Sequence, residues 1–110
     1  MSERVILRDV KDALGSRYLA AFLTVEGDVV IEGQDVGDGV EQVFGDGIRE
    51  YEWTYTIHAA HIPTLRQALA ASGDVLAALR ERFSGDDAAS LKQFLEDRDI
   101  PHDVWTRLGD

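Results

Sequence analysis

The sequence contains no cysteine, only two prolines and no long apolar segment. The absence of cysteine excludes disulfide bonds, thiolate metal sites and cysteine nucleophiles. The longest uninterrupted apolar run spans residues 19–23, whereas a membrane-spanning helix needs about 20 apolar residues. Residues 1–4 do not open a secretory signal. We therefore expect a cytoplasmic protein that has no membrane partner.

Basic residues are also scarce, and they are unevenly distributed. The 110 residues include 11 Lys and Arg against 21 Asp and Glu, for a net charge of −10. Residues 26–52 contain nine acids and one base, Arg49, which gives −8, whereas residues 1–25 sum to +1 and residues 53–110 to −3. An anionic surface repels phosphate backbones and attracts basic proteins. The charge therefore favours a basic protein partner over nucleic acid; the alternative is that it serves solubility alone.

Known catalytic and ligand-binding motifs are missing. His58 and His61 lie three residues apart, but no HExxH or second ligand pair accompanies them. No EF-hand frame fits when Gly39 or Gly47 is placed at its sixth position. Residues 37–42 lack the glycines of a phosphate loop, and no serine lies in a G-x-S-x-G elbow. We expect no metal, no cofactor and no enzymatic activity; an enzyme with a site assembled from dispersed residues ranks last among the alternatives.

The first half of the chain has the pattern of a β-sheet. Residues 18–25 are largely apolar at both alternate sets, as in a central strand that is covered on both faces. A turn at residues 26–28, followed by β-branched residues, predicts a hairpin. Residues 4–14 fit either a strand or a helical turn. Asp38 resembles the N-cap of a short helix that Gly45 ends.

The strongest periodic signal lies at residues 50–58, where apolar and polar residues alternate. This alternation predicts a half-buried strand whose aromatic face packs in the core and whose polar face meets water or a partner. The inward set is Tyr51, Trp53, Tyr55 and Ile57, and the outward set is Glu50, Glu52, Thr54, Thr56 and His58.

The second half of the chain changes to helical periodicity. Pro63 suits the first turn of one helix, and Asp74 can cap a second. Either Asp86 or Asp87 can cap a third helix, which Pro101 prevents from continuing.

These elements predict an α+β fold. We expect an antiparallel sheet of about four strands, packed on one face by about three helices. The chain length suits a single domain. The sheet-forming half covers residues 1–58, the helical half residues 62–99, and a short terminal edge strand residues 103–108.

A series of turn and core motifs runs through the chain: Val-Ile-Glu-Gly-Gln-Asp-Val-Gly at residues 30–37, Phe-Gly-Asp-Gly at 44–47, Glu-Tyr-Glu-Trp at 50–53, and Phe-Leu-Glu before Ile-Pro at 94–101. The series resembles a group of small acidic bacterial proteins that are largely uncharacterised. Such proteins are similar in type to bacterial immunity proteins, which bind and block a toxin domain. The resemblance implies a protein-binding role and supplies no catalytic residue.

The charge and the strand pattern lead to one functional hypothesis, a non-enzymatic acidic module that docks a basic protein partner. If helices cover the aromatic face of residues 50–58, the opposite face is the expected site. The alternative is a self-associating structural protein, a homodimer formed through its helices or through the final segment near Trp105. The candidate partner-binding residues are Asp35, Asp38, Glu41, Asp46, Glu50, Glu52 and His58.

Overall fold

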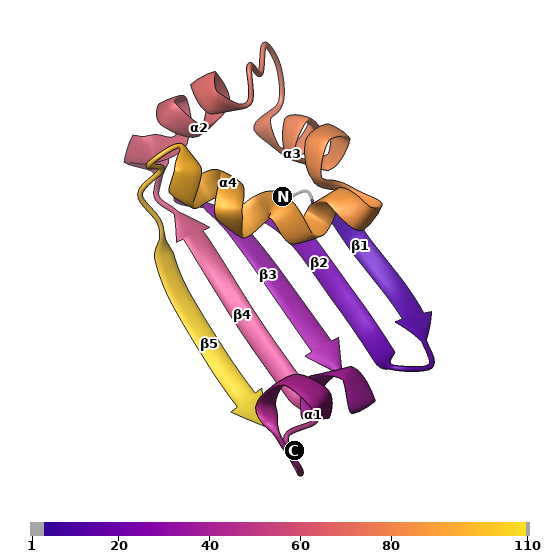
Figure 1. The fold of residues 1–110 in the computed structure, drawn as a ribbon. Helices are drawn as coiled ribbons and strands as arrows, with labels where there is room; N and C mark the ends of the chain where they lie inside the picture. The colour runs from indigo at the N-terminus through magenta and orange to yellow at the C-terminus, as the bar shows by residue number, and fades with distance from the viewer. Residues whose placement is uncertain (1–3, 110) are drawn as a thin grey trace.

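Five antiparallel strands form one sheet in the computed structural model, which describes residues 4–109. The strands lie side by side in sequence order, with α1 between β3 and β4 and the other helices between β4 and β5 (Figure 1). The predicted α+β class is confirmed, with one strand and one helix more than expected in the described residues. The strands are β1 (Arg4–Asp12), β2 (Gly15–Leu23), β3 (Val29–Val36), β4 (Glu50–Ile57) and β5 (Asp103–Gly109); the helices are α1 (Asp38–Phe44), α2 (Ile62–Ala68), α3 (Val75–Phe83) and α4 (Leu91–Asp97), with 3₁₀ turns η1 (Ala59–His61) and η2 (Gly85–Ser90).

Residues 4–12, for which the sequence allowed either a strand or a helical turn, form the first strand of a hairpin. β1 continues as a strand to Asp12, because pairing with β2 satisfies its backbone hydrogen bonds over that length. The register shifts once, between Ile6 and Arg8, which marks a β-bulge. The second hairpin joins β2 to β3 through the predicted turn, where Gly27 has a φ of 88°.

The helices between β4 and β5 begin differently from one another. The predicted cap of α3 is confirmed, because Asp74 Oδ1 accepts a hydrogen bond from the Leu76 N–H at 3.1 Å. The predicted cap of the next helix is wrong. Asp86 and Asp87 lie in the 3₁₀ turn η2, which places Ala88 in the core before α4 begins.

The helical segments that pack on the sheet lie on one of its faces, here called the helix side (Figure 1). Between the two layers is a core of fully buried apolar residues, which includes Ile31 and Ile57 of the sheet and Leu79 and Leu95 of the helices. Burial of such residues from both layers is the main favourable contribution to folding. The helical layer therefore fixes which face of every strand turns inward.

The second face of the sheet, here called the uncovered face, carries no helix (Figure 1). The prediction that residues 18–25 are covered on both faces is therefore wrong. Ala20 points to the uncovered face and is nevertheless 0% exposed. The ion pair between Arg4 of β1 and Glu32 of β3 crosses β2 on this face. Long side chains of the neighbouring strands therefore shield part of β2 from water, although no helix covers it.

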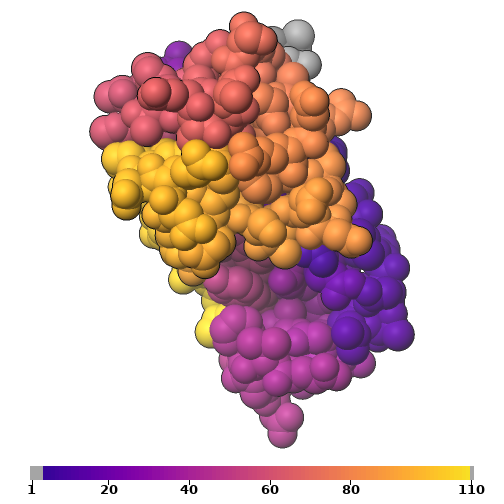
Figure 2. Space-filling view, turned by 45° about the horizontal axis from the view of Figure 1, so that its top comes forward, coloured from indigo at the N-terminus to yellow at the C-terminus, as the bar shows by residue number. Residues whose placement is uncertain are grey.

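The helix side is itself only partly covered. α1 lies at the end of the sheet opposite to α2 and α3 (Figure 1), and a hollow separates α1 from the η2–α4 segment, with the sheet as its floor (Figure 2). Among residues 4–109, no helix combines the length and the apolar character needed to cross a bilayer.

Candidate functional site

The uncovered face is organised in rows of side chains that run across the strands. Paired residues of neighbouring strands point to the same face. One row contains Tyr18, Gln34, Glu52 and Arg107, and the adjacent row contains Ala20, Glu32, Thr54 and Trp105. Four strands thus bring carboxylates and aromatic rings together on one surface.

A shallow hollow of about 300 Å³ lies within these two rows. Tyr18 and Trp105 line it, together with the carboxylates Glu32 and Glu52 and the small side chain of Thr54. Trp105 is 52% exposed, an unusual state for so large an apolar ring. The hollow, bounded by aromatic and acidic groups, has the chemistry to hold a positively charged side chain.

Glu50 and Glu52 form one hydrogen-bonded network beside this hollow. Gln34 Nε2 donates to Glu50 Oε1 at 2.9 Å and to Glu52 Oε1 at 3.2 Å. Arg107 Nη2 lies 3.2 Å from Glu50 Oε1, and its Nε lies 3.5 Å from Glu52 Oε2. The carboxyl groups of Glu50 and Glu52 therefore share one guanidinium.

The two carboxyl groups influence each other's titration. The hydrogen bond between them lowers the pKa of Glu50, which Gln34 and Arg107 also stabilise as the anion. The same hydrogen bond, with a contribution from burial, raises the pKa of Glu52. Glu52 therefore takes up a proton before Glu50 does as the pH falls.

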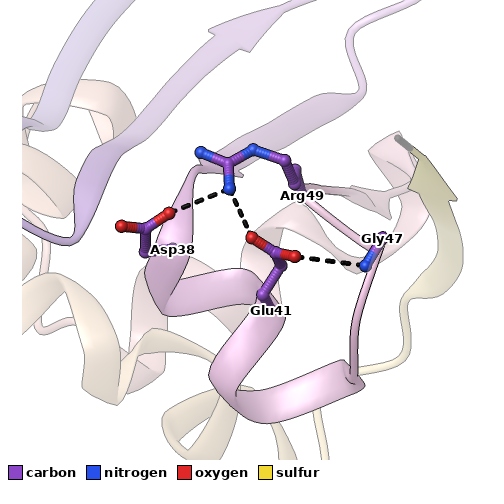
Figure 3. A network of polar contacts seen from close by, with 4 residues as sticks. All are labelled: Asp38, Glu41, Gly47 and Arg49. Atoms are coloured by element: carbon purple, nitrogen blue, oxygen red, sulfur yellow. Dashed lines mark hydrogen bonds and ion pairs between the residues drawn. The ribbon is translucent and has the colours of Figure 1, made fainter.

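Asp38 and Glu41 lie elsewhere, in a cluster at α1 (Figure 3). Arg49 donates to Asp38 Oδ1 at 2.8 Å and to Glu41, and Glu41 Oε2 accepts from the Gly47 N–H at 3.1 Å. These contacts tie α1 to the loop before β4 and raise the pKa of Arg49. The predicted N-cap role of Asp38 is wrong, because Gly37 occupies that position and Asp38 bonds to Arg49 instead.

Asp46 is exposed in the loop between α1 and β4. This loop follows α1, so Asp46 is near the α1 cluster along the chain and lies outside the strands of the sheet. Its carboxylate makes no hydrogen bond or ion pair with the other described residues. Asp46 is therefore separate from the network of Glu50 and Glu52.

Asp35 lies on the helix side, where it lines the hollow beside η2 and α4. Burial raises the pKa of its carboxyl group, and the charges of Arg8 and Arg17 oppose that shift. Tyr51 and Trp53 form part of the floor of this hollow, with ring centroids 5.0 Å apart. Asp35 is thus separated by the sheet from the network of Glu50 and Glu52.

His58 lies on the uncovered face, but at the far end of β4. Its Nε2 is 2.6 Å from Asp103 Oδ2, and this hydrogen bond raises the pKa of the imidazole. Eight residues separate it from Glu50 along an extended strand, which corresponds to about 27 Å. No set of three or more potential metal ligands comes together in the described part of the chain.

The predicted acidic segment therefore divides among three places. Of the seven candidate residues, only Glu50 and Glu52 lie in one network on the uncovered face. Sequence reasoning missed their neighbours, although the alternation of β3 contains the signal: Val30, Glu32 and Gln34 occupy alternate positions. The neighbours that it missed are Tyr18, Glu32, Gln34, Trp105 and Arg107.

Comparison of the chain with family models, with curated proteins and with solved structures gives no match.

Proposed function

We propose that the protein is a non-enzymatic binding module that docks a basic protein partner on the uncovered face of its sheet. The observation that carries the proposal is the hollow between Tyr18 and Trp105, with Glu32 and Glu52 in its lining. A lysine or arginine of the partner would enter this hollow, where aromatic faces and carboxylates both attract a cation.

The carboxylates have capacity for such a partner. Glu32 is bonded to Arg4, and Glu52 to Gln34 and Arg107. A carboxylate can accept about four hydrogen bonds, so further donors can be accommodated without breaking these contacts. Exposed tryptophan and tyrosine are also the residue types that contribute most strongly to protein interfaces.

The overall charge of −10 supports the same class of partner. A long-range anionic field accelerates the encounter with a basic protein, and short-range pairing then selects the orientation. In the immunity-like form of the proposal, the partner is a toxin domain whose positive groove is occupied by these carboxylates in place of nucleic acid.

The test compares two double variants that remove the same charge. Glu32→Gln with Glu52→Gln alters the hollow, whereas Asp86→Asn with Asp87→Asn alters the exposed turn η2. The wild-type protein is immobilised, partners are captured from an extract of the native host at low salt, and a bound protein is released at high salt and identified. The affinity of each variant for that protein is then measured by calorimetry.

We expect the hollow variant to bind about tenfold or more weakly, and the η2 variant to change affinity by less than about twofold. The affinity of the wild type is also expected to fall as salt screens the charges. Equal losses of affinity in both variants would show that only the net charge of the protein matters, and not the hollow. Unchanged binding of the hollow variant would exclude this face as the docking site.

A further inference from the structure

The two edges of the sheet differ in how they are protected against pairing with another chain. β1 carries a bulge between Ile6 and Arg8 and charged side chains along its length, and α3 and η2 lie against it. Bulges, lysines and covering elements are the usual means by which an edge strand is blocked. The β1 edge is therefore unsuited to strand addition.

Among the described residues, the β5 edge lacks both the bulge and the covering elements that protect β1. β5 pairs with β4 in one continuous register and contains no proline, lysine or bulge. Its outer side is free of any other element (Figure 1). Val104 is 55% exposed, Trp105 52% and Leu108 48%. An edge that is long, regular and apolar is a template for a further strand.

We propose that the strand that pairs with this edge is β5 of a second copy of the chain, antiparallel to the first, with the two-fold axis at Thr106. When the two β5 strands pair over their full length, Asp103–Gly109, Val104 of each copy lies opposite Leu108 of the other copy. It also places Trp105 opposite Arg107 of the second copy, where a guanidinium can lie over an indole ring. Apolar residues meet apolar residues, and the strand is complementary to itself.

The charge of the edge favours the same partner. The chain as a whole carries −10, so two copies repel each other over most of their surface. β5 contains one acid, Asp103, and one base, Arg107, and is neutral. Pairing of two β5 strands therefore adds no repulsion between like net charges at the contact itself. The two sheets would join into one of ten strands, with both helical layers on the same side.

Single cysteines test the pairing, because the chain has no cysteine of its own. In the proposed dimer Thr106 faces itself across the axis, at the Cα separation of about 4.5–5.5 Å that a disulfide bridges. Trp105→Cys is the matched control, since its diagonal separation of about 7–8 Å is too long. Under mild oxidation we expect Thr106→Cys to form about tenfold more covalent dimer than Trp105→Cys.

Light scattering provides the second measurement. The wild type is expected to reach twice the chain mass of 12.2 kDa as its concentration is raised. Val104→Lys should remain a monomer, because a lysine would face Leu108 of the second copy, whereas Val10→Lys on the β1 edge should behave as the wild type. A wild type that stays monomeric, a Val104→Lys variant that still dimerises, or equal cross-linking at residues 105 and 106 would overturn the proposal. None of these outcomes depends on the basic partner.

Discussion

The two faces of β4 differ in how far they are buried. On the helix side, Tyr55 and Ile57 are buried in the core. On the uncovered face, Thr54 and Thr56 alternate with them and remain partly exposed. Adjacent residues of a pleated strand point to opposite faces. The helical layer therefore buries the side chains of one face and leaves those of the other face accessible. Stability and the proposed binding can therefore be tested by separate substitutions.

The largest expected effect comes from adjacent substitutions in β4. Ile57→Ala removes a side chain that is 0% exposed and should lower the free energy of unfolding by about 2–5 kcal/mol. Thr56→Ala, one residue away on the uncovered face, should change it by less than about 1 kcal/mol. Chemical denaturation measures both. Similar losses in the two variants would show that the faces do not differ as described.

A smaller loss of stability is expected from a substitution at Gly33, which packs against the indole of Trp53. A Cβ on Gly33 would lie 2.2 Å from ring atoms of Trp53, so Gly33→Ala must displace the indole. We expect a loss of about 1–3 kcal/mol and a shifted indole N–H resonance of Trp53, with that of Trp105 unchanged. Gly73→Ala is the control, because its added methyl group meets nothing within 4 Å. An unshifted Trp53 signal would contradict the close packing.

The smallest effect concerns His58 on the uncovered face. Its pKa is raised by the hydrogen bond to Asp103, so its contribution to stability is present below the unfolded pKa of about 6.5 and is lost as the pH rises through the folded value. The difference in unfolding free energy between wild type and His58→Gln should therefore be larger at about pH 5.5 than at about pH 9. Thermal unfolding measures it. In the Asp103→Asn background, the effect of His58→Gln on the unfolding free energy should depend less on pH. A difference between wild type and His58→Gln that grows as the pH rises would contradict the prediction.

The acidic segment illustrates where sequence order and spatial order diverge. The sequence predicted that Asp35 and Glu50 belong to one anionic surface, but the two residues lie on opposite faces of the sheet. Asp35 occupies a helix-side position of β3, whereas Glu50 occupies an uncovered position of β4. Between them the chain forms α1, whose Asp38 and Glu41 hold Arg49. Charge counted along the chain cannot show this division, because it contains no information about faces.

Elements governed by local interactions were predicted well. The alternation at residues 50–58 and the cap at Asp74 depend on neighbours within a few residues, so β4 and α3 follow from the sequence. The caps assigned to Asp38 and Asp86 were wrong, because a distant arginine in the first case and the packing of a 3₁₀ turn in the second determine the local structure. The extent of β1 also depended on a partner strand.

The sequence alone determined the fold class, the negative charge, and the inward and outward sets of β4, since periodicity and composition are properties of the chain itself. Only the tertiary structure decided that Tyr18, Glu32, Glu52 and Trp105, from four strands, surround one hollow. It also decided that β5 is the open edge and β1 the blocked one. These features depend on strand order and register, which result from burying one face of the whole sheet at once.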